Sequence, residues 1–191
     1  MYGSLEGLSK PGLALELGEE IVQQWRGGYS ARPPPMSPDH PHWHATEKKY
    51  ADLLPGEIPS TESLEDTMTR TLPLWNKRIW PCLQQGQNVL IVAHGNSLRG
   101  VVKHIEGLTP EQIQKVGIPN GIPLIYKFEK SKCNSRLGDL LPIKMESAIE
   151  PLSGEFLEKK GLLRAALARE EELAKGVPGY EVSIKYNSRS C

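Results

Sequence analysis

The sequence has no excess of charge of either sign. Its 191 residues include 23 Lys and Arg and 23 Asp and Glu, so the formal net charge is zero. Nucleic acids are usually bound through a broad basic face, which this balance argues against. No apolar run approaches the roughly 20 residues of a membrane span, and the first ten residues lack a basic flank followed by an apolar stretch. We therefore expect no nucleic-acid partner, no membrane partner and no secretory signal.

Cysteine is also scarce. Cys82, Cys133 and Cys191 are an odd number and do not have the spacing of metal ligands. They suit a reducing compartment better than a disulfide framework, so we expect a cytoplasmic protein. Hydrophobic residues make up 38% and charged residues 24%, which is typical of a globular chain.

The amino-terminal region predicts one helix and then a proline-rich loop. Four apolar residues recur every four positions, as on one face of a helix of about four turns: Leu13, Leu17, Ile21 and Trp25. Gly27 and Gly28 end this helix. Residues 32–59 are proline-rich, and the prolines of the run 32–38 exclude helix and central strand there.

Three of the five histidines alternate in this loop, at His40, His42 and His44. Alternating ligands on an extended segment share one face, so a metal site is one interpretation. No carboxylate or cysteine pattern completes a ligand set, and the prolines indicate a loop. We therefore favour a solvated loop and expect no metal.

The next region alternates helix and strand patterns, as α/β proteins do. A capped helix is predicted over 60–79, with a kink or break at Pro73. Residues 89–93 form a continuous apolar, β-branched run, which is typical of a strand buried on both faces. A helix is predicted over 98–105 and a further strand over 124–128.

From residue 131 onward, the main feature is an amphipathic helix predicted over 155–175. Its apolar stripe consists of Phe156, Leu163, Leu167 and Leu173. The sequence Gly-Val-Pro-Gly at 176–179 ends it. We therefore divide the chain into a main domain, 1–130, and a carboxyl-terminal extension, 131–191.

The predicted strand at 89–93 leads through His94, Gly95, Asn96 and Ser97 into a helix. Open α/β sheets bind ligands at the carboxyl ends of their strands, and a helix start offers N–H groups to an anion. Gly95 permits close approach of the backbone. An imidazole at this point can act as base or nucleophile, or stabilise a phosphate when protonated. The alternative is a histidine that only caps the helix, and the pattern alone does not separate the two.

The run Val-Leu-Ile-Val-Ala-His-Gly-Asn-Ser-Leu-Arg at 89–99 closely resembles the second histidine motif of cofactor-dependent phosphoglycerate mutases, which belong to the histidine phosphatase superfamily. Other segments resemble the same family in the same order: its substrate loop at 2–10, its tryptophan-arginine and proline loop at 24–35, a helix start at 59–64 and the approach to its last strand at 117–124. The resemblance is collinear from Tyr2 to Phe128 and is specific to the mutase branch.

This resemblance implies an isomerase of glycolysis that interconverts 3-phosphoglycerate and 2-phosphoglycerate through a phosphohistidine. It implies 2,3-bisphosphoglycerate as the priming phosphate donor, small phosphorylated three-carbon acids as ligands, and no metal. His94 matches the family's catalytic second histidine. The matching substrate-binding positions are Tyr2, Lys10, Arg26, Gly95 and Asn96. Hydroxyl and cationic groups at such positions suit phosphate and carboxylate.

The chain departs from the family pattern at the nucleophile. The family's nucleophilic histidine lies in an Arg-His-Gly motif after its first strand, and this sequence contains no Arg-His dipeptide. Only Met1 precedes Tyr2, where the family has a glutamate as general acid. Gly27 stands at the second arginine of the family's Trp-Arg-Arg, for which Arg32 is a candidate substitute. The chain thus resembles the family without its amino-terminal third. Met1 is either an internal methionine of a longer protein or the start of a short form or degenerate relative.

We therefore expect an α/β fold: a phosphoglycerate mutase-like sheet flanked by helices on both faces and lacking the family's first strand. Residues 89–93 are the expected inner strand, and 124–128 are expected near an edge. Without the first strand, 89–93 lacks a ladder partner on one side, and each orphaned buried backbone group costs about 1–3 kcal/mol. Residues 180–186, which include Val182 and Ile184, are the candidate replacement.

Three functions stay open on the sequence. The first is a phosphoglycerate mutase whose nucleophile is absent from this chain, which by itself is then expected to be inactive. The second is a non-catalytic relative that binds phosphorylated ligands or a protein partner. The third is a phosphatase with a thiol nucleophile, Cys82 or Cys133, although neither lies in a glycine-rich anion loop. The oligomeric state is also left open, a homo-oligomer included.

Overall fold

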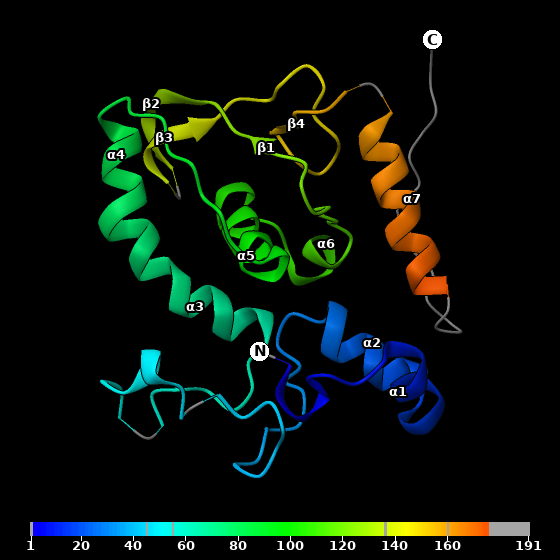
Figure 1. Cartoon of the computed structure of the whole chain (residues 1–191). Coiled ribbons are helices and arrows are strands. Elements are labelled where there is room, and N and C mark those ends of the chain that lie inside the picture. The colour runs from blue at the N-terminus through cyan, green and yellow to red at the C-terminus, as the bar shows by residue number, and fades with distance from the viewer. Residues whose placement is uncertain (1, 45, 55, 136, 160, 176–191) are drawn as a thin grey trace.

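The chain is a mixed α/β protein, as predicted. The computed structural model describes residues 2–175 apart from 45, 55, 136 and 160. The α-helices are α1 (Lys10–Leu17), α2 (Glu19–Gly27), α3 (Leu64–Leu74), α4 (Trp80–Gln84), α5 (Gly95–Glu106), α6 (Pro110–Gln114) and α7 (Leu162–Lys175). Short turns of other helix types are η1 (Gly3–Leu5), η2 (Lys48–Tyr50) and η3 (Trp75–Ile79). The strands are β1 (Leu124–Ile125), β2 (Phe128–Ser135), β3 (Gly138–Pro142) and β4 (Glu155–Phe156), which gather at one end of the molecule (Figure 1).

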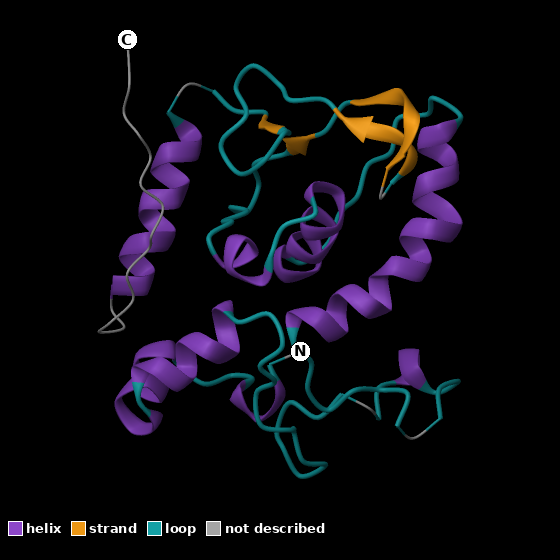
Figure 2. Cartoon of the chain, turned by 180° about the vertical axis from the view of Figure 1, so that it is seen from behind, coloured by secondary structure: helices purple, strands orange, loops and turns teal. Residues whose placement is uncertain are grey.

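The strands form two small antiparallel sheets instead of one central sheet. β1 pairs with β4, and β2 pairs with β3 as a hairpin. The strand predicted over 124–128 is divided between the two sheets. Leu124 of β1 pairs with Phe156 of β4, whereas Phe128 of β2 pairs with Pro142 of β3. Figure 2 shows the strands together on one side of the helices, not between two helical layers.

The prediction of an inner strand at 89–93 is wrong. The segment has no assigned secondary structure, belongs to neither sheet and joins α4 to α5 as a connection. Leu90 and Val92 are 86% and 85% exposed, where burial on both faces was expected. The physical reason is that the described part of the chain places no other strand in a ladder with it.

The single helix predicted near the amino terminus is broken at Gly18. This residue has φ +87° and ψ 145°, and it both ends α1 and begins α2. Because of this break, the four apolar residues do not share one buried face. Leu13 and Val22 are buried, whereas Leu17 and Ile21 are exposed. The predicted stop is confirmed, since α2 ends at Gly27.

The helix predicted over 60–79 begins at Leu64 and stays helical past Pro73. Directly after Pro73, residues Trp75–Ile79 adopt the wider π-helical winding before α4. A proline inside a helix removes one backbone donor and crowds the preceding turn, and a local change of winding relieves this. The expected break is therefore a change of helix type.

Helix α5 is the central packing element of the described chain. Val102 belongs to a buried cluster with Leu64, Leu108, Ile113, Val116 and Leu152. Ile105, one turn away, joins Trp75 and Leu137 in a second cluster. The predicted helix is thus confirmed, and its buried side connects both halves of the core.

The region after residue 130 returns to this core. β2 runs across the predicted boundary at 130, Leu152 packs in the first cluster, and the backbone N–H and hydroxyl of Ser153 donate to Glu106 at 2.6 and 2.9 Å. The division into two domains stays a prediction.

The last helix begins at Leu162, not 155, because Phe156 lies in β4. The predicted stop at 176–179 and the strand candidate at 180–186 lie outside the described residues.

None of the helices within the described ranges is both long enough and apolar enough to cross a membrane.

The backbone at Gly18 supports a test of the helix break. Gly18→Ala should lower the free energy of unfolding by about 1–3 kcal/mol, because its φ and ψ lie in a region that essentially only glycine adopts. Gly27→Ala is the matched control: a Cβ there meets no atom within 4 Å, and alanine favours helix, so stability should be unchanged or slightly higher. Chemical unfolding of both variants measures this, and equal effects would contradict the role given to Gly18.

Candidate functional site

A cavity of about 310 Å³ opens where the amino-terminal turn, the start of α3 and the start of α5 meet. Its polar lining residues include Tyr2, Glu62, Arg70, His94, Asn96 and Arg99. Three of these, Tyr2, His94 and Asn96, are predicted site residues. The volume is at the lower end of the range of small-molecule sites.

His94 has two structural roles in this cavity. It is the N-cap of α5, and its Nδ1 accepts a hydrogen bond from the backbone N–H of Asn96 at 3.2 Å. Because Nδ1 is the acceptor, a neutral His94 ring carries its proton on Nε2. The same side chain lines the cavity. Capping and a ligand-binding role are therefore compatible, since capping fixes the ring and leaves Nε2–H as a donor.

Tyr2 meets this histidine motif from the other end of the sequence. The side-chain amide of Asn96 donates to the Tyr2 hydroxyl at 3.2 Å, and the Tyr2 and His94 rings lie 6.2 Å apart at 72°. Gly3 makes this approach possible. Its φ is +59°, and a Cβ there would lie 2.1 Å from the carbonyl oxygen of Pro34. Only glycine fits between Tyr2 and the proline loop.

Arg70 enters the cavity from α3 and is held by Glu62. Its Nε and Nη2 donate to the two carboxylate oxygens at 2.7 and 3.2 Å. The Glu62 side chain is 4% exposed and that of Arg70 is 56% exposed. Burial raises the pKa of Glu62, but the hydrogen bonds and charge of Arg70 are among the contributions that outweigh it, so this pKa lies below its ordinary value. The bidentate pair uses two of the five N–H donors of Arg70.

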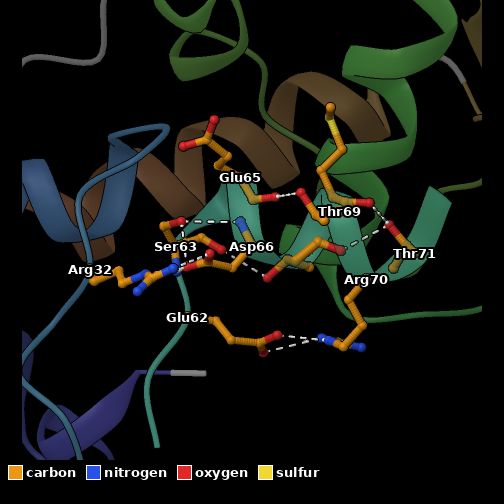
Figure 3. Close-up of polar contacts among 10 residues, drawn as sticks. Arg32, Glu62, Ser63, Glu65, Asp66, Thr69, Arg70 and Thr71 are labelled. Carbon is orange, nitrogen blue, oxygen red and sulfur yellow. Dashed lines mark hydrogen bonds and ion pairs between the residues drawn. The ribbon is translucent and has the colours of Figure 1, made fainter. Parts of the chain in front are cut away.

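The start of α3 is fixed by a second bidentate pair, shown in Figure 3. Arg32 donates to Asp66 from Nε at 2.6 Å and from Nη2 at 2.5 Å. Asp66 also accepts from the backbone N–H of Ser63, whose hydroxyl in turn accepts from the N–H of Asp66, which completes a capping box. The hydrogen bonds from Arg32 and then those from Ser63 hold the pKa of Asp66 well below its usual range. Arg32 thus ties the proline loop to α3. It is not among the residues that line the cavity, so the structure does not support it as the substitute arginine.

Arg99 lies on α5, one turn after His94, and also lines the cavity. Its Nη2 donates to the carbonyl oxygen of Ile113 at 2.8 Å, which fixes the guanidinium against the carboxyl-terminal end of α6. Together Arg70 and Arg99 bring two guanidinium groups to the cavity, and Glu6 and Glu62 bring two carboxylates.

The remaining predicted residues stand as follows. Gly95 is the first residue of α5, beside His94 and Asn96. Lys10 begins α1 and Arg26 lies in α2, but the positions of their side chains are outside what the structure describes, so their roles stay predictions. Trp25 and Gly28, near Arg26, do line the cavity. Cys82 is a free, half-buried thiol of α4 that does not line it, and the side chain of Cys133 is not described.

Sequence reasoning missed Arg70, Arg99 and Glu62. A signal for Arg70 is present in the polar stripe Ser63, Thr67 and Arg70, which recurs at helical spacing on a helix whose other faces are partly apolar. Arg99 stood inside the quoted histidine motif without a role. Glu62 precedes the helix cap and resembles an ordinary acidic first-turn residue, so only the fold identifies it as buried.

The histidine segment forms a loop, as predicted. The His40 and His42 rings lie 5.7 Å apart, and Nδ1 of His40 accepts from the backbone N–H of His42. Within the described residues, no group of three or more His, Cys, Asp or Glu side chains is arranged to hold a metal ion.

With the fold and cavity established, comparison with known proteins identifies the class. The family profile of the histidine phosphatase superfamily (branch 1) matches residues 1–138. The chain therefore belongs to the histidine phosphatase superfamily.

Within that superfamily, a 2,3-bisphosphoglycerate-dependent phosphoglycerate mutase of Nitrosococcus oceani is 42% identical over 130 residues. The alignment covers 68% of this chain and 54% of that relative, so the chain spans about half the length of the curated relative it matches. The predicted resemblance to the mutase branch is confirmed.

The ion pair at the start of α3 predicts a pH-dependent stability. Asp66→Asn should lower the free energy of unfolding at pH 7 by about 1 kcal/mol, because it weakens the capping box and removes the Arg32 pair. A carboxyl whose folded-state pKa is depressed contributes stability above its unfolded-state pKa of about 3.9, and loses it as the pH falls through the lower, folded-state value. The difference between wild type and variant should therefore shrink below about pH 4.

Unfolding by denaturant at several pH values between 7 and 3 measures this difference. Asp52→Asn, at an exposed aspartate, is the control and should change stability little. A difference for Asp66→Asn that stays constant over this range would show that the depressed pKa is not the source of the stabilisation.

Proposed function

We propose that this chain provides the phosphate- and carboxylate-binding side of a 2,3-bisphosphoglycerate-dependent phosphoglycerate mutase, an isomerase of glycolysis. Its ligands are 3-phosphoglycerate, 2-phosphoglycerate and the bisphosphate, and its setting is the cytoplasm. The family reaction passes through a phosphohistidine, whose histidine is not part of this sequence. The similarity to the Nitrosococcus oceani mutase supports the substrate class.

One observation carries the proposal: Tyr2 meets His94 and Asn96 at one cavity although it lies more than ninety residues from them in sequence, and the Asn96 amide donates a hydrogen bond to the Tyr2 hydroxyl at 3.2 Å. All three also match the family's motifs in sequence. A histidine needed only as a helix cap has no reason to lie beside a tyrosine hydroxyl and an amide in a cavity.

The donor set of the cavity fits phosphorylated acids. Nε2–H of His94, the side-chain amide of Asn96 and the Tyr2 hydroxyl are hydrogen-bond donors, and the amino-terminal end of α5 adds the positive end of a helix dipole. When bound, 2,3-bisphosphoglycerate supplies the phosphoryl group of the reaction. Arg70 and Arg99 provide charge for its oxygens, and Lys10 and Arg26 add to this by family resemblance.

The carboxylates that line the cavity offset part of the positive charge of its arginines. Glu62 already binds Arg70, so a phosphate near Arg70 shares the guanidinium with a buried carboxylate. Such a pair positions the arginine but reduces the net attraction for an anion. We therefore expect weak, salt-sensitive binding by this chain.

The absence of an Arg-His dipeptide supports a second candidate function, a non-catalytic protein that binds phosphorylated ligands. The two candidates share the cavity and differ in turnover, so binding and catalysis are tested separately.

Two substitutions of His94 separate ligand binding from helix capping. His94→Asn keeps a good N-cap residue and removes the imidazole, whereas His94→Ala removes both. We expect His94→Asn to weaken 3-phosphoglycerate binding about tenfold or more, since a hydrogen bond to a charged group contributes roughly 1.5–3 kcal/mol, with little loss of stability. Calorimetric titration at low salt measures affinity, and binding should weaken further at about 0.15 M salt.

Lys77→Ala is the charge control, because Lys77 is exposed and does not line the cavity. It should leave affinity nearly unchanged. If His94→Asn binds like the wild type while His94→Ala does not, His94 acts only as a cap and the proposed site is wrong.

The chain by itself should show no mutase turnover. Conversion of 3-phosphoglycerate to 2-phosphoglycerate, primed with 2,3-bisphosphoglycerate, is the assay, since the sequence offers no Arg-His-Gly nucleophile. Turnover of about 1 per second, the low end for ordinary enzymes, would show that another residue accepts the phosphoryl group.

A further inference from the structure

Glu62 places a buried negative charge beside the guanidinium of Arg70, at the wall of the candidate site. Its side chain is 4% exposed, and both of its carboxylate oxygens accept hydrogen bonds from Arg70 (Figure 3). The hydrogen bonds and the charge of Arg70 help to hold the pKa of Glu62 below its ordinary value, so this carboxylate is ionised at neutral pH. The cavity is thus lined by a buried anion, although the ligands proposed for it are anions themselves.

The position of this carboxylate is fixed by its two neighbours in the chain. The Thr61 hydroxyl donates to the carbonyl oxygen of Pro33 at 2.7 Å, and the Ser63 N–H donates to Asp66 at 2.9 Å. These bonds hold residues 61–63 between the proline loop and α3. A charge that is held in place in this way acts on a ligand without first having to be oriented.

Stability alone does not account for a buried carboxylate at this point. An ion pair that is partly buried repays only part of the cost of taking its charges out of water, and neutral residues of similar volume are often as stable. The effect on a ligand is larger, because a buried charge is screened less than an exposed one. Glu6 also lines the cavity, but it is exposed and therefore acts on a ligand more weakly.

Arg70 keeps three of its five N–H donors after it has paired with Glu62. These donors suit the oxygens of one phosphate or carboxylate. The positive charge that would attract a further phosphate is offset by Glu62 a hydrogen-bond length away. The pair therefore offers directional hydrogen bonds with little net charge, and this combination favours a ligand of lower charge.

We infer that Glu62 is a specificity-determining residue that, through Arg70, makes the cavity favour singly phosphorylated acids over bisphosphorylated ones. The inference rests on the proposed function, because it concerns the same cavity and the same class of ligand. The acids 3-phosphoglycerate and 2,3-bisphosphoglycerate share one carbon skeleton and differ by one phosphate, which adds about 1.5–2 negative charges at neutral pH. The ratio of their affinities therefore reports mainly on charge.

Glu62→Gln tests this inference in the full chain. Glutamine has nearly the volume of glutamate and keeps a carbonyl oxygen for Arg70, but it removes the charge. We expect the affinity for 2,3-bisphosphoglycerate to rise about fivefold or more relative to that for 3-phosphoglycerate, because removing a nearby negative charge favours the more highly charged ligand. Calorimetric titration of both ligands at low salt measures this ratio, and the change should shrink at about 0.15 M salt.

Two further variants are controls. Glu65→Gln removes the same formal charge from an exposed residue of α3 that does not line the cavity, so the ratio should be unchanged. Glu62→Asp keeps the charge but shortens the side chain, so the ratio should stay close to that of the wild type although the contact with Arg70 is altered. Melting temperatures check that each variant is folded.

The wild type supplies a second test that does not depend on the folding of a variant. At low salt, 2,3-bisphosphoglycerate should bind no more than about tenfold more tightly than 3-phosphoglycerate, because its additional phosphate meets a guanidinium whose charge is already offset. A larger advantage for the bisphosphate would overturn the inference.

The inference is also overturned if folded Glu62→Gln keeps the wild-type ratio, whether it binds both ligands more tightly or more weakly, since Glu62 would then only orient Arg70. An equal shift of the ratio in Glu62→Asp and Glu62→Gln would likewise show that charge is not the cause. In these cases, binding of 3-phosphoglycerate by the wild type leaves the proposed function standing. If neither the wild type nor Glu62→Gln binds either ligand, the proposed function and this inference fail together.

Discussion

The burial of one side of α5 is the constraint on which the rest of the described structure depends. Val102 and Ile105 join the two hydrophobic clusters, and Glu106 at the end of the helix accepts from Ser153, which brings the segment after the hairpin onto the same core. The same helix begins at His94 and carries Arg99 one turn later. Because close-packed interiors transmit displacement, a change in the packing of α5 would move the cavity directly.

The two bidentate pairs at α3 act differently because their burial differs. Arg32 is largely exposed, so solvent screens its pair with Asp66. This pair mainly fixes the position of the proline loop against the start of α3. Glu62 is almost completely buried, and a buried carboxylate without its partner is strongly destabilising. Arg70 is therefore first a counter-ion for Glu62, and its availability to a phosphate is limited by that role.

The sequence predicts local features well and non-local partners poorly. The α5 helix, its cap region and the meeting of His94, Asn96 and Tyr2 follow from periodicity and from motif resemblance. The break at Gly18 was missed because Leu13, Leu17 and Ile21 keep a regular spacing across it, while the backbone of one glycine overrides the pattern. Arg70 was missed because its importance comes from Glu62, eight residues away, and burial of Glu62 is a property of the fold.

Residues 89–93 show this difference most clearly, and they bear on the site itself. Their apolar, β-branched composition predicts a strand, but a strand forms in a sheet only when other strands pair with it, which composition does not specify. In this structure the segment is held by the packing of Ile91 and by the helix that follows, not by a ladder. Segments with few buried contacts and exposed backbone groups open at low free energy. His94 lies at the end of this segment, so the order of the proposed phosphate site depends on its helix cap and on the packing of Ile91.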